Sequence, residues 1–270
     1  MALILPWLRI VVGVLVYIVF ALLASYVTRK AGGNLKEMGG RTSQVVIIIG
    51  AVTNLLVLIA TLLLLAFWIG WPISALGLSF TSRDLFVSII GVAAIVALAL
   101  ALVQWLHSTG RSRVTSHQPL RGSSGLSGLI VLALVLFIVA LQEEVLYRGY
   151  ITLNLLDSGP VVIILTSTLV FAAIHLLTNR ANFYQILSWM ISGAIFSYSY
   201  LISGSIWVPI VIHFATDLTN VLVFNIVGQL SFFTITPAPT DRHRAFVRAA
   251  YAILQLAALL AFYGPALKLV

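Results

Sequence analysis

The chain has 270 residues, of which 61% are hydrophobic and only 8% are charged. Soluble domains carry about 25% charged residues, and disordered chains combine low hydrophobicity with high charge, so the composition excludes both classes. The net charge is +8, but in so apolar a chain it indicates basic loops of a membrane protein, and we expect no nucleic-acid partner. The chain has no cysteine, which excludes disulfides, thiolate nucleophiles and Cys-ligated metals.

Eight segments are long and apolar enough to span a membrane as helices, which takes about 20 residues. These segments are 10–27, 45–71, 85–106, 126–142, 160–177, 183–202, 205–227 and 246–263. The predicted fold is therefore all-α, a polytopic protein of the cell membrane with about eight transmembrane helices. We divide it into a three-helix N-terminal region with basic loops (1–125), a central region (126–227), and a loop with a C-terminal transmembrane helix (228–270).

The basic residues predict how the chain is oriented in the bilayer. Eleven of the fifteen Lys and Arg residues lie in the regions 28–44, 107–125, 178–182 and 228–248. With eight helices, these four regions all lie on one side of the membrane. Because basic loops favour the cytoplasm, we predict that both termini are extracytoplasmic.

The polar loop 107–125 is the best internal boundary, because the three predicted helices before it have no ionisable residue in their cores. After it come ionisable residues that we expect within the membrane: Glu143, Glu144, Arg148, His175, His213 and Asp217. A charged group within the bilayer costs roughly 2.5–3.5 kcal/mol on insertion scales, so such residues are functional candidates by default.

Helical spacing predicts which of these residues share a face. Glu144 and Arg148 are four positions apart and can form an ion pair, which leaves Glu143 pointing elsewhere and able to act. His213 and Asp217 have the same spacing, so the carboxylate can orient the imidazole. A purely structural charge cluster is the alternative for both pairs.

Helix length indicates whether the groups can meet. The turn at 157–160 predicts a hairpin, and Glu143 precedes this turn by about as many residues as His175 follows it, so the two should lie level. His213 follows Gly204 in the next hairpin by only nine residues, and this places it roughly 10 Å away from that level. The sequence therefore predicts that Glu143 faces His175 and leaves the depth of His213 open.

A carboxylate and an imidazole in a partly dry cavity can together deprotonate a water molecule. A second imidazole with a polar neighbour can stabilise the oxyanion that forms when this water attacks an amide. The set of residues thus favours hydrolysis of peptide bonds within the membrane.

Three motifs on successive predicted helices resemble a known family. The segments E-E-V-L-Y-R at 143–148, F-A-A-I-H at 171–175 and H-F-A-T-D at 213–217 are similar to the EExxxR, FxxxH and HxxxN/D signatures. These mark the CPBP family of CAAX proteases and bacteriocin-processing (Abi) enzymes. The resemblance covers about residues 126–227, which it identifies as a CPBP-like intramembrane peptidase core.

The resemblance implies a glutamic endopeptidase that needs no cofactor. It assigns activation of water to Glu143 and His175, the oxyanion site to His213 with Asp217, and supporting roles to Glu144 and Arg148. Prenyl proteases of the eukaryotic type have Asn where this chain has Asp217. An ionised Asp cannot donate to an oxyanion, so Asp217 is either protonated or only orients His213.

The implied substrate is a membrane-associated protein or peptide, lipidated or not, which is cut near its C-terminus or the membrane edge. A zinc peptidase is one alternative, although the chain contains no HExxH motif. A proton-coupled transporter is another, and a non-catalytic scaffold or immunity protein of the same family is a third.

Overall fold

The protein is described by a computed structural model that covers residues 4–30, 44–116, 123–178, 181–224 and 231–264. The long helices are α1 (Leu5–Lys30), α2 (Gln44–Leu63), α3 (Ser82–Ser108), α4 (Ser123–Glu144), α6 (Pro160–Thr178), α7 (Phe183–Ser203), α8 (Trp207–Phe224) and α9 (Asp241–Tyr263). Shorter segments are the π-helices η1 (Leu64–Ile69) and η3 (Val145–Tyr150), the 3-10 helices η2 (Ile73–Leu76) and η4 (Leu156–Ser158), and the four-residue α5 (Ile151–Asn154). The strands are β1 (Arg113–Ser116) and β2 (Phe233–Thr236).

Eight helical spans in the described residues are long and apolar enough to cross a membrane, which confirms the all-α polytopic fold. Two differences from the predicted boundaries bear on the site. The span predicted to end at 142 continues through η3 and α5 to Asn154. The last helix begins at Asp241, because the Thr240 hydroxyl accepts a hydrogen bond from the His243 amide and caps it. Arg244, which we expected in a loop, is therefore helical, and so is Arg248, which we counted both in the basic region 228–248 and in the predicted helix 246–263.

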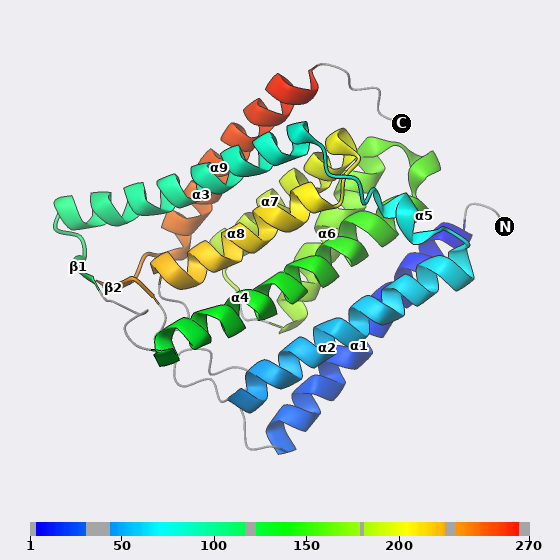
Figure 1. Ribbon diagram of the computed structural model, residues 1–270, viewed down its shortest axis with the longest axis horizontal. Coiled ribbons are helices and arrows are strands. Elements are labelled where there is room, and N and C mark those ends of the chain that lie inside the picture. Colours follow the sequence, from blue (N-terminus) through cyan, green and yellow to red (C-terminus); the bar gives the residue numbers. More distant parts are fainter. Residues whose placement is uncertain (1–3, 31–43, 117–122, 179–180, 225–230, 265–270) are drawn as a thin grey trace.

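The helices pack side by side in a bundle (Figure 1). Helix α1 contacts α2, α2 contacts α4, and α4 contacts α8. Helix α3 packs against α8 and α9, and α7 packs against α6 and α9. The start of α1 and the end of α9 lie at the same end of the bundle, opposite β1 and β2 (Figure 1). The division of the chain into three parts stays a prediction.

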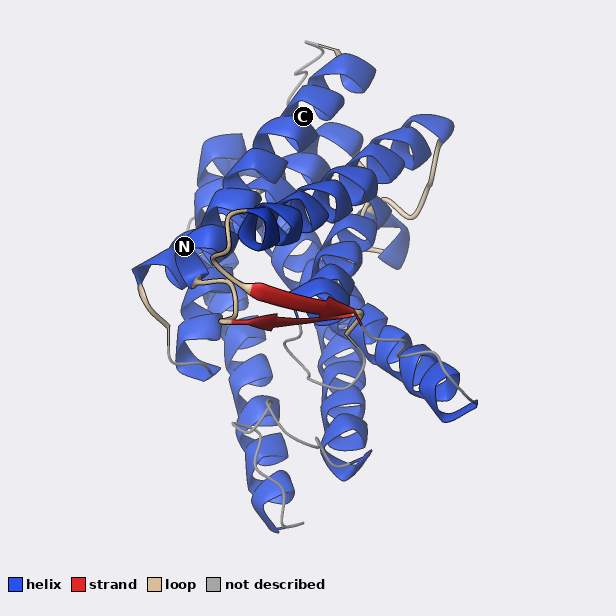
Figure 2. Ribbon diagram, turned by 90° about the vertical axis from the view of Figure 1, so that its left-hand side faces the viewer, coloured by secondary structure: helices blue, strands red, loops and turns tan. Residues whose placement is uncertain are grey.

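The strands form a two-stranded antiparallel sheet at one end of the bundle (Figure 2). Arg113 pairs with Thr236 and Ser116 pairs with Phe233. The Ser112 hydroxyl also donates a hydrogen bond to the Pro237 carbonyl at 2.8 Å. These contacts join the segment after α3 to the segment before α9, two regions that the sequence predicted only as polar loops.

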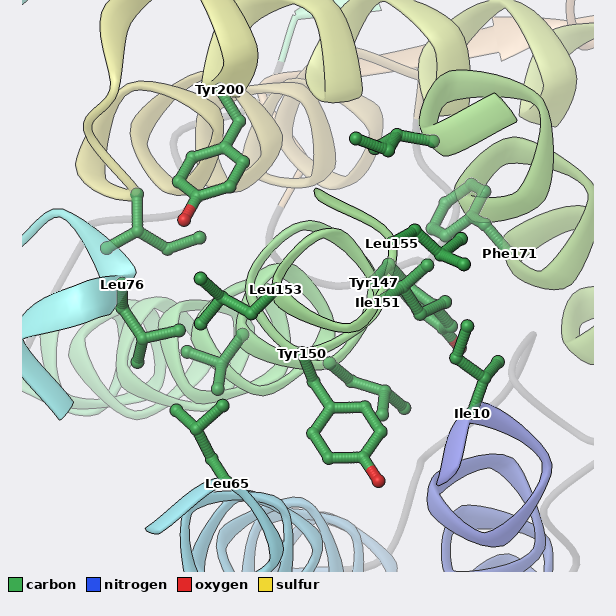
Figure 3. Close-up of a cluster of buried hydrophobic side chains, with 14 of the residues drawn as sticks. Ile10, Leu65, Leu76, Tyr147, Tyr150, Ile151, Leu153, Leu155, Phe171 and Tyr200 are labelled. Carbon is green, nitrogen blue, oxygen red and sulfur yellow. The ribbon is translucent and has the colours of Figure 1, made fainter. Parts of the chain in front are cut away.

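Apolar side chains occur both inside and outside the bundle, as expected of a membrane protein. The largest buried cluster surrounds Tyr147 and Tyr150, which are both fully buried (Figure 3). The Tyr150 hydroxyl donates to the Arg9 carbonyl at 2.8 Å and so ties η3 to α1. On the outside, Phe67 and Phe246 are 84% and 75% exposed, which is the arrangement that lipid contact favours.

A close contact between two turns fixes the far end of the α7–α8 hairpin. Gly77 has a φ of 70°, and a Cβ atom there would lie 1.9 Å from the Gly204 carbonyl oxygen. The Ile206 amide donates to the Gly77 carbonyl at 3.0 Å. Only glycine allows the two turns to lie this close together. The contact holds the η2 turn against the start of α8.

Candidate active site

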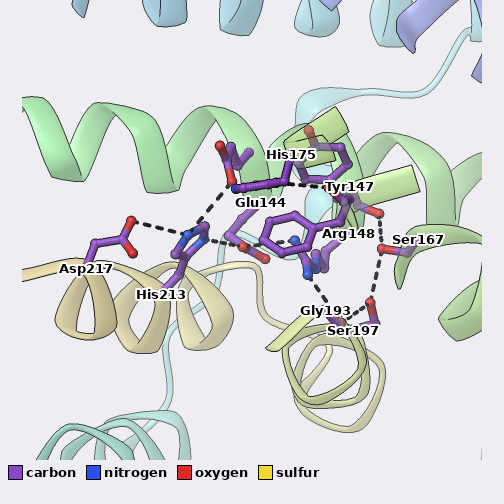
Figure 4. A network of polar contacts seen from close by, with 11 residues as sticks. Glu144, Tyr147, Arg148, Ser167, His175, Gly193, Ser197, His213 and Asp217 are labelled. Atoms are coloured by element: carbon purple, nitrogen blue, oxygen red, sulfur yellow. Dashed lines mark hydrogen bonds and ion pairs between the residues drawn. The ribbon is translucent and has the colours of Figure 1, made fainter. Parts of the chain in front are cut away.

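A buried ion pair lies where α4 continues into η3. Glu144 is the last residue of α4, and its Oε1 lies 3.1 Å from Nη1 of Arg148 (Figure 4). Both side chains are fully buried. The pair that we expected from the i, i+4 spacing is therefore present. It also lies at a π-helical turn, a feature often found at functional sites.

The Arg148 guanidinium is enclosed by aromatic rings and a backbone carbonyl. Its Nη2 donates to the Gly193 carbonyl at 3.2 Å, and it lies 4.8 Å from the ring centre of Phe171 and 5.3 Å from that of Phe196. A Cβ atom on Gly193 would lie 3.2 Å from Cα of Thr168, so glycine allows α7 to approach α6 closely here. This approach brings the carbonyl within reach of the buried cation.

A second chain of hydrogen bonds holds η3, α6 and α7 together. The Ser197 hydroxyl contacts the Ser167 hydroxyl at 3.0 Å, and the Ser167 hydroxyl donates to the Tyr147 carbonyl at 2.8 Å (Figure 4). Hydrogen bonds of this kind replace the water that buried polar groups lose within a bilayer. Two of the segments that carry motif residues, η3 and α6, are thus held together with α7.

His213 on α8 lies between three carboxylates. Its Nδ1 is 2.6 Å from Oε1 of Glu144, and its Nε2 is 3.4 Å from Oδ2 of Asp217 and 3.8 Å from Oε2 of Glu143 (Figure 4). Because an ionised carboxylate can only accept, Nδ1 carries the proton of the short hydrogen bond. The ring also stacks on Phe196 with centroids 5.0 Å apart, which restricts its orientation further.

Glu143 is bound less tightly than its neighbour Glu144. Its side chain is buried, with the residue only 7% exposed, and its Oε2 atom has no hydrogen-bond partner among the described residues. It lines a cavity of about 270 Å³ together with His175, His213 and Asp217. The unused carboxylate therefore opens onto the same space as both imidazoles.

His175 on α6 also lines this cavity. Its Nδ1 lies 2.9 Å from the Phe171 carbonyl, and its ring packs between Phe171 and Trp189 at centroid distances of 4.4 and 5.1 Å. A carbonyl can only accept, so Nδ1 carries the proton and Nε2 holds the lone pair of the neutral ring. The helix backbone thus selects the tautomer that a proton acceptor needs.

Among the described residues, no three His, Asp or Glu side chains are arranged as a site that could hold a metal ion.

Residues 125–219 match the family model described as "Type II CAAX prenyl endopeptidase Rce1-like". The chain contains an Rce1-like domain. No curated protein and no solved structure matches the chain.

The Rce1-like domain contains every motif residue named from the sequence, and the family resemblance is confirmed. The geometry of the site differs from our expectation in two respects. We expected Asp217 to orient His213 and Glu144 to serve Arg148 alone, but Glu144 contacts both Arg148 and His213. The 10 Å offset calculated for His213 is also absent. The calculation placed both hairpin turns level, whereas the α7–α8 turn is fixed independently by Gly77.

Several residues that line the cavity were not predicted from the sequence. Helix α9 contributes Asp241, Arg244 and Arg248, and α7 contributes Ser188 and Trp189. The spacing of the two arginines was a usable signal, since i, i+4 residues share a helix face. We counted both only among the basic residues of the region 228–248, and Arg244 lay outside the predicted helix 246–263.

Proposed function

We propose that this protein is an intramembrane endopeptidase that hydrolyses a peptide bond with a glutamate-activated water. The observation that carries the proposal is the position of Glu143: its Oε2 atom is buried, has no hydrogen-bond partner among the described residues, and lies 3.8 Å from Nε2 of His213 beside the cavity that His175 also lines. A carboxylate that is kept away from the structural ion pair is suited to general-base work.

The chemistry begins with a water molecule between Glu143 and His175. Glu143, assisted by Nε2 of His175, takes a proton as the water oxygen bonds to the carbonyl carbon of the substrate. The carbonyl π bond becomes an oxyanion. When the oxyanion collapses, the C–N bond breaks, and the proton held by Glu143 passes to the leaving amine. The products are a new carboxyl terminus and a new amino terminus.

His213 supplies the oxyanion contact in this scheme. Its Nδ1–H is engaged by Glu144, and its Nε2 faces Asp217 and Glu143. A ring with a carboxylate at each nitrogen holds protons on both, so Nε2–H can donate to the oxyanion. Asp217 then orients His213 and need not donate itself. Glu144 and Arg148 are positioning residues, because they act through His213 and do not reach the cavity as Glu143 does.

The substrate we propose is a membrane-associated protein or peptide, cut near its C-terminus. This proposal follows from the Rce1-like domain and from the position of the cavity inside a bundle of membrane-length helices. The proposed mechanism needs no cofactor. A zinc-dependent mechanism is the alternative, and a chelator distinguishes the two.

We further propose that the cavity is reached from the cytoplasm. Gln185 and Arg244, near the N-terminal ends of α7 and α9, line the cavity. Arg111 precedes β1 and Arg113 begins it, at the same end of the bundle. By the positive-inside rule we expect this end in the cytoplasm and both termini outside it. Four of the basic residues in this argument lie outside the described residues: Lys36, Arg41, Arg121 and Arg180.

A cleavage assay tests the proposal. Purified protein in detergent is incubated with a library of C-terminal peptides, with and without S-prenylation, and wild type is compared with Glu143→Ala in the presence and absence of a zinc chelator. We expect cleavage that survives the chelator and is absent in the variant. Loss of cleavage with chelator would support a metal mechanism, and cleavage by the variant would contradict the role of Glu143.

A further inference from the structure

Helix α9 contributes a basic wall to the cavity that the proposed chemistry does not use. Arg244 and Arg248 lie one turn apart on α9, and both line the cavity. Arg244 forms an ion pair with Asp241, which also accepts a hydrogen bond from Nδ2 of Asn182 at 2.6 Å. The charge of Arg244 is thus already balanced by a neighbour on its own helix.

Arg248 has no such neighbour. Its Nη1 is buried and has no hydrogen-bond partner, and the guanidinium makes no ion pair with any residue that the structure describes. Asp217 lines the same cavity, but its ion pair is with His213. A buried guanidinium nitrogen that lacks an acceptor is costly. The arrangement therefore leaves room for an acceptor that comes from outside the chain.

Ser188 on α7 provides a second donor beside this wall. Its hydroxyl is also buried, lines the cavity, and has no hydrogen-bond partner among the described residues. Donors from two different helices thus face a space in which they have no acceptor. A planar carboxylate suits this space, because its two oxygens match the fork of a guanidinium and can accept from a hydroxyl as well.

We propose that Arg248, with Ser188, binds the C-terminal carboxylate of the peptide substrate. This proposal rests on the proposed function. It makes the free C-terminus of the substrate a determinant of specificity. The binding role belongs to α9, outside the residues that match the family model.

The size of the cavity explains why the bound carboxylate is a chain terminus. Ligand pockets usually have volumes of about 300–1,000 Å³, and this cavity has about 270 Å³. It holds only a short stretch of peptide between Glu143 and the α9 wall. The side chain of Glu143 is 9% exposed and that of Arg244 is 34% exposed, so the basic wall lies towards the mouth. The carboxylate at Arg248 is then a few residues from the cleaved bond.

Arg248 could instead serve only to balance the charge of Asp217. The two roles differ in one measurable respect. A carboxylate-binding Arg248 discriminates between peptides that differ only in the C-terminal group, whereas a charge-balancing Arg248 affects all peptides equally.

The experiment measures binding separately from cleavage. Full-length Glu143→Gln protein in detergent is offered a pool of matched peptide pairs, with and without S-farnesyl cysteine, each made with a free C-terminal carboxylate and as the carboxamide. Retained peptides are quantified by mass spectrometry. The same pool is applied to Glu143→Gln combined with Arg248→Gln, Arg248→Lys or Ser188→Ala. Arg242→Gln is the matched control, because Arg242 lies on α9, is exposed and does not line the cavity.

We expect the carboxylate forms to be retained roughly tenfold or more over their amides, the order expected of a charge-assisted contact. Arg248→Gln should abolish this preference, Arg248→Lys and Ser188→Ala should reduce it, and Arg242→Gln should leave it intact. Equal retention of acid and amide, a preference that survives Arg248→Gln, or no retention of any peptide would overturn the proposal. Cleavage by wild type is scored separately, so selective binding without cleavage would count against the proposed function alone.

Discussion

Nδ1 of His213 lies 2.6 Å from Oε1 of Glu144, the same oxygen that accepts a hydrogen bond from Arg148 at 3.1 Å. One carboxylate oxygen thus joins an ion pair within the α4–η3 segment to an imidazole on α8, 69 positions later in the chain. Oε2 of the adjacent Glu143 has no hydrogen-bond partner among the described residues and lies 3.8 Å from Nε2 of His213. Two neighbouring glutamates therefore have different surroundings. We assign a positioning role to Glu144 and the role of general base to Glu143.

Removing Glu144 should destabilise the protein. Glu144→Ala leaves the Arg148 guanidinium buried and unpaired, which is expected to cost about 3–5 kcal/mol of unfolding free energy. The double variant Glu144→Gln with Arg148→Met should recover part of this loss but none of the activity, since His213 stays unoriented. Unfolding temperature in detergent and peptide cleavage are measured together. An active double variant would show that the pair has no positioning role.

Gly193→Ala should weaken the packing of α6 against α7. The added Cβ would lie 3.2 Å from both Cα and Cγ2 of Thr168, and overpacking of this kind costs about 1–3 kcal/mol. The matched control is Gly50→Ala on α2, where no atom lies within 4 Å of the new Cβ. We expect a lower unfolding temperature for Gly193→Ala only. Equal effects at both positions would mean that the approach of the helices at Gly193 is not tight.

His213 and Asp217 should differ in their importance for catalysis. His213→Ala removes the oxyanion donor, and such losses lower kcat by about 10²–10³-fold. Asp217→Asn keeps a polar neighbour 3.4 Å from Nε2, so we expect a loss of about tenfold or less. Steady-state kinetics on a cleaved peptide checks both values. A larger loss for Asp217→Asn than for His213→Ala would place the donor at Asp217.

The predicted orientation can be checked by cysteine labelling, because the chain has no cysteine of its own. Ser116 on β1 and Ser74 in η2 are both exposed and lie towards opposite ends of the bundle (Figure 1). In intact cells, a membrane-impermeant maleimide should label Ser74→Cys. Ser116→Cys should react only after permeabilisation. The reverse pattern would place the termini in the cytoplasm.

The sequence predicts the fold well because its signals are local. Eight apolar runs give eight spans, and the i, i+4 spacing gives the contact of Glu144 with Arg148. The contact of Glu144 with His213 joins distant segments, and only the packing of α4 against α8 creates it. The α9 wall was missed for a different reason. The cap at Thr240 starts the helix before its hydrophobic run, so Arg244 was left outside the predicted helix and was not paired with Arg248 on one helix face.

The different roles of Glu143 and Glu144 are tested most directly by the variant Glu143→Gln. Its peptide cleavage and its unfolding temperature are measured together. Because Oε2 of Glu143 has no hydrogen-bond partner among the described residues, the substitution should leave the unfolding temperature within a degree or so of wild type. Cleavage should fall below detection, since an amide cannot take a proton from water. A folded Glu143→Gln protein that still cleaves peptide at the wild-type rate would contradict the account.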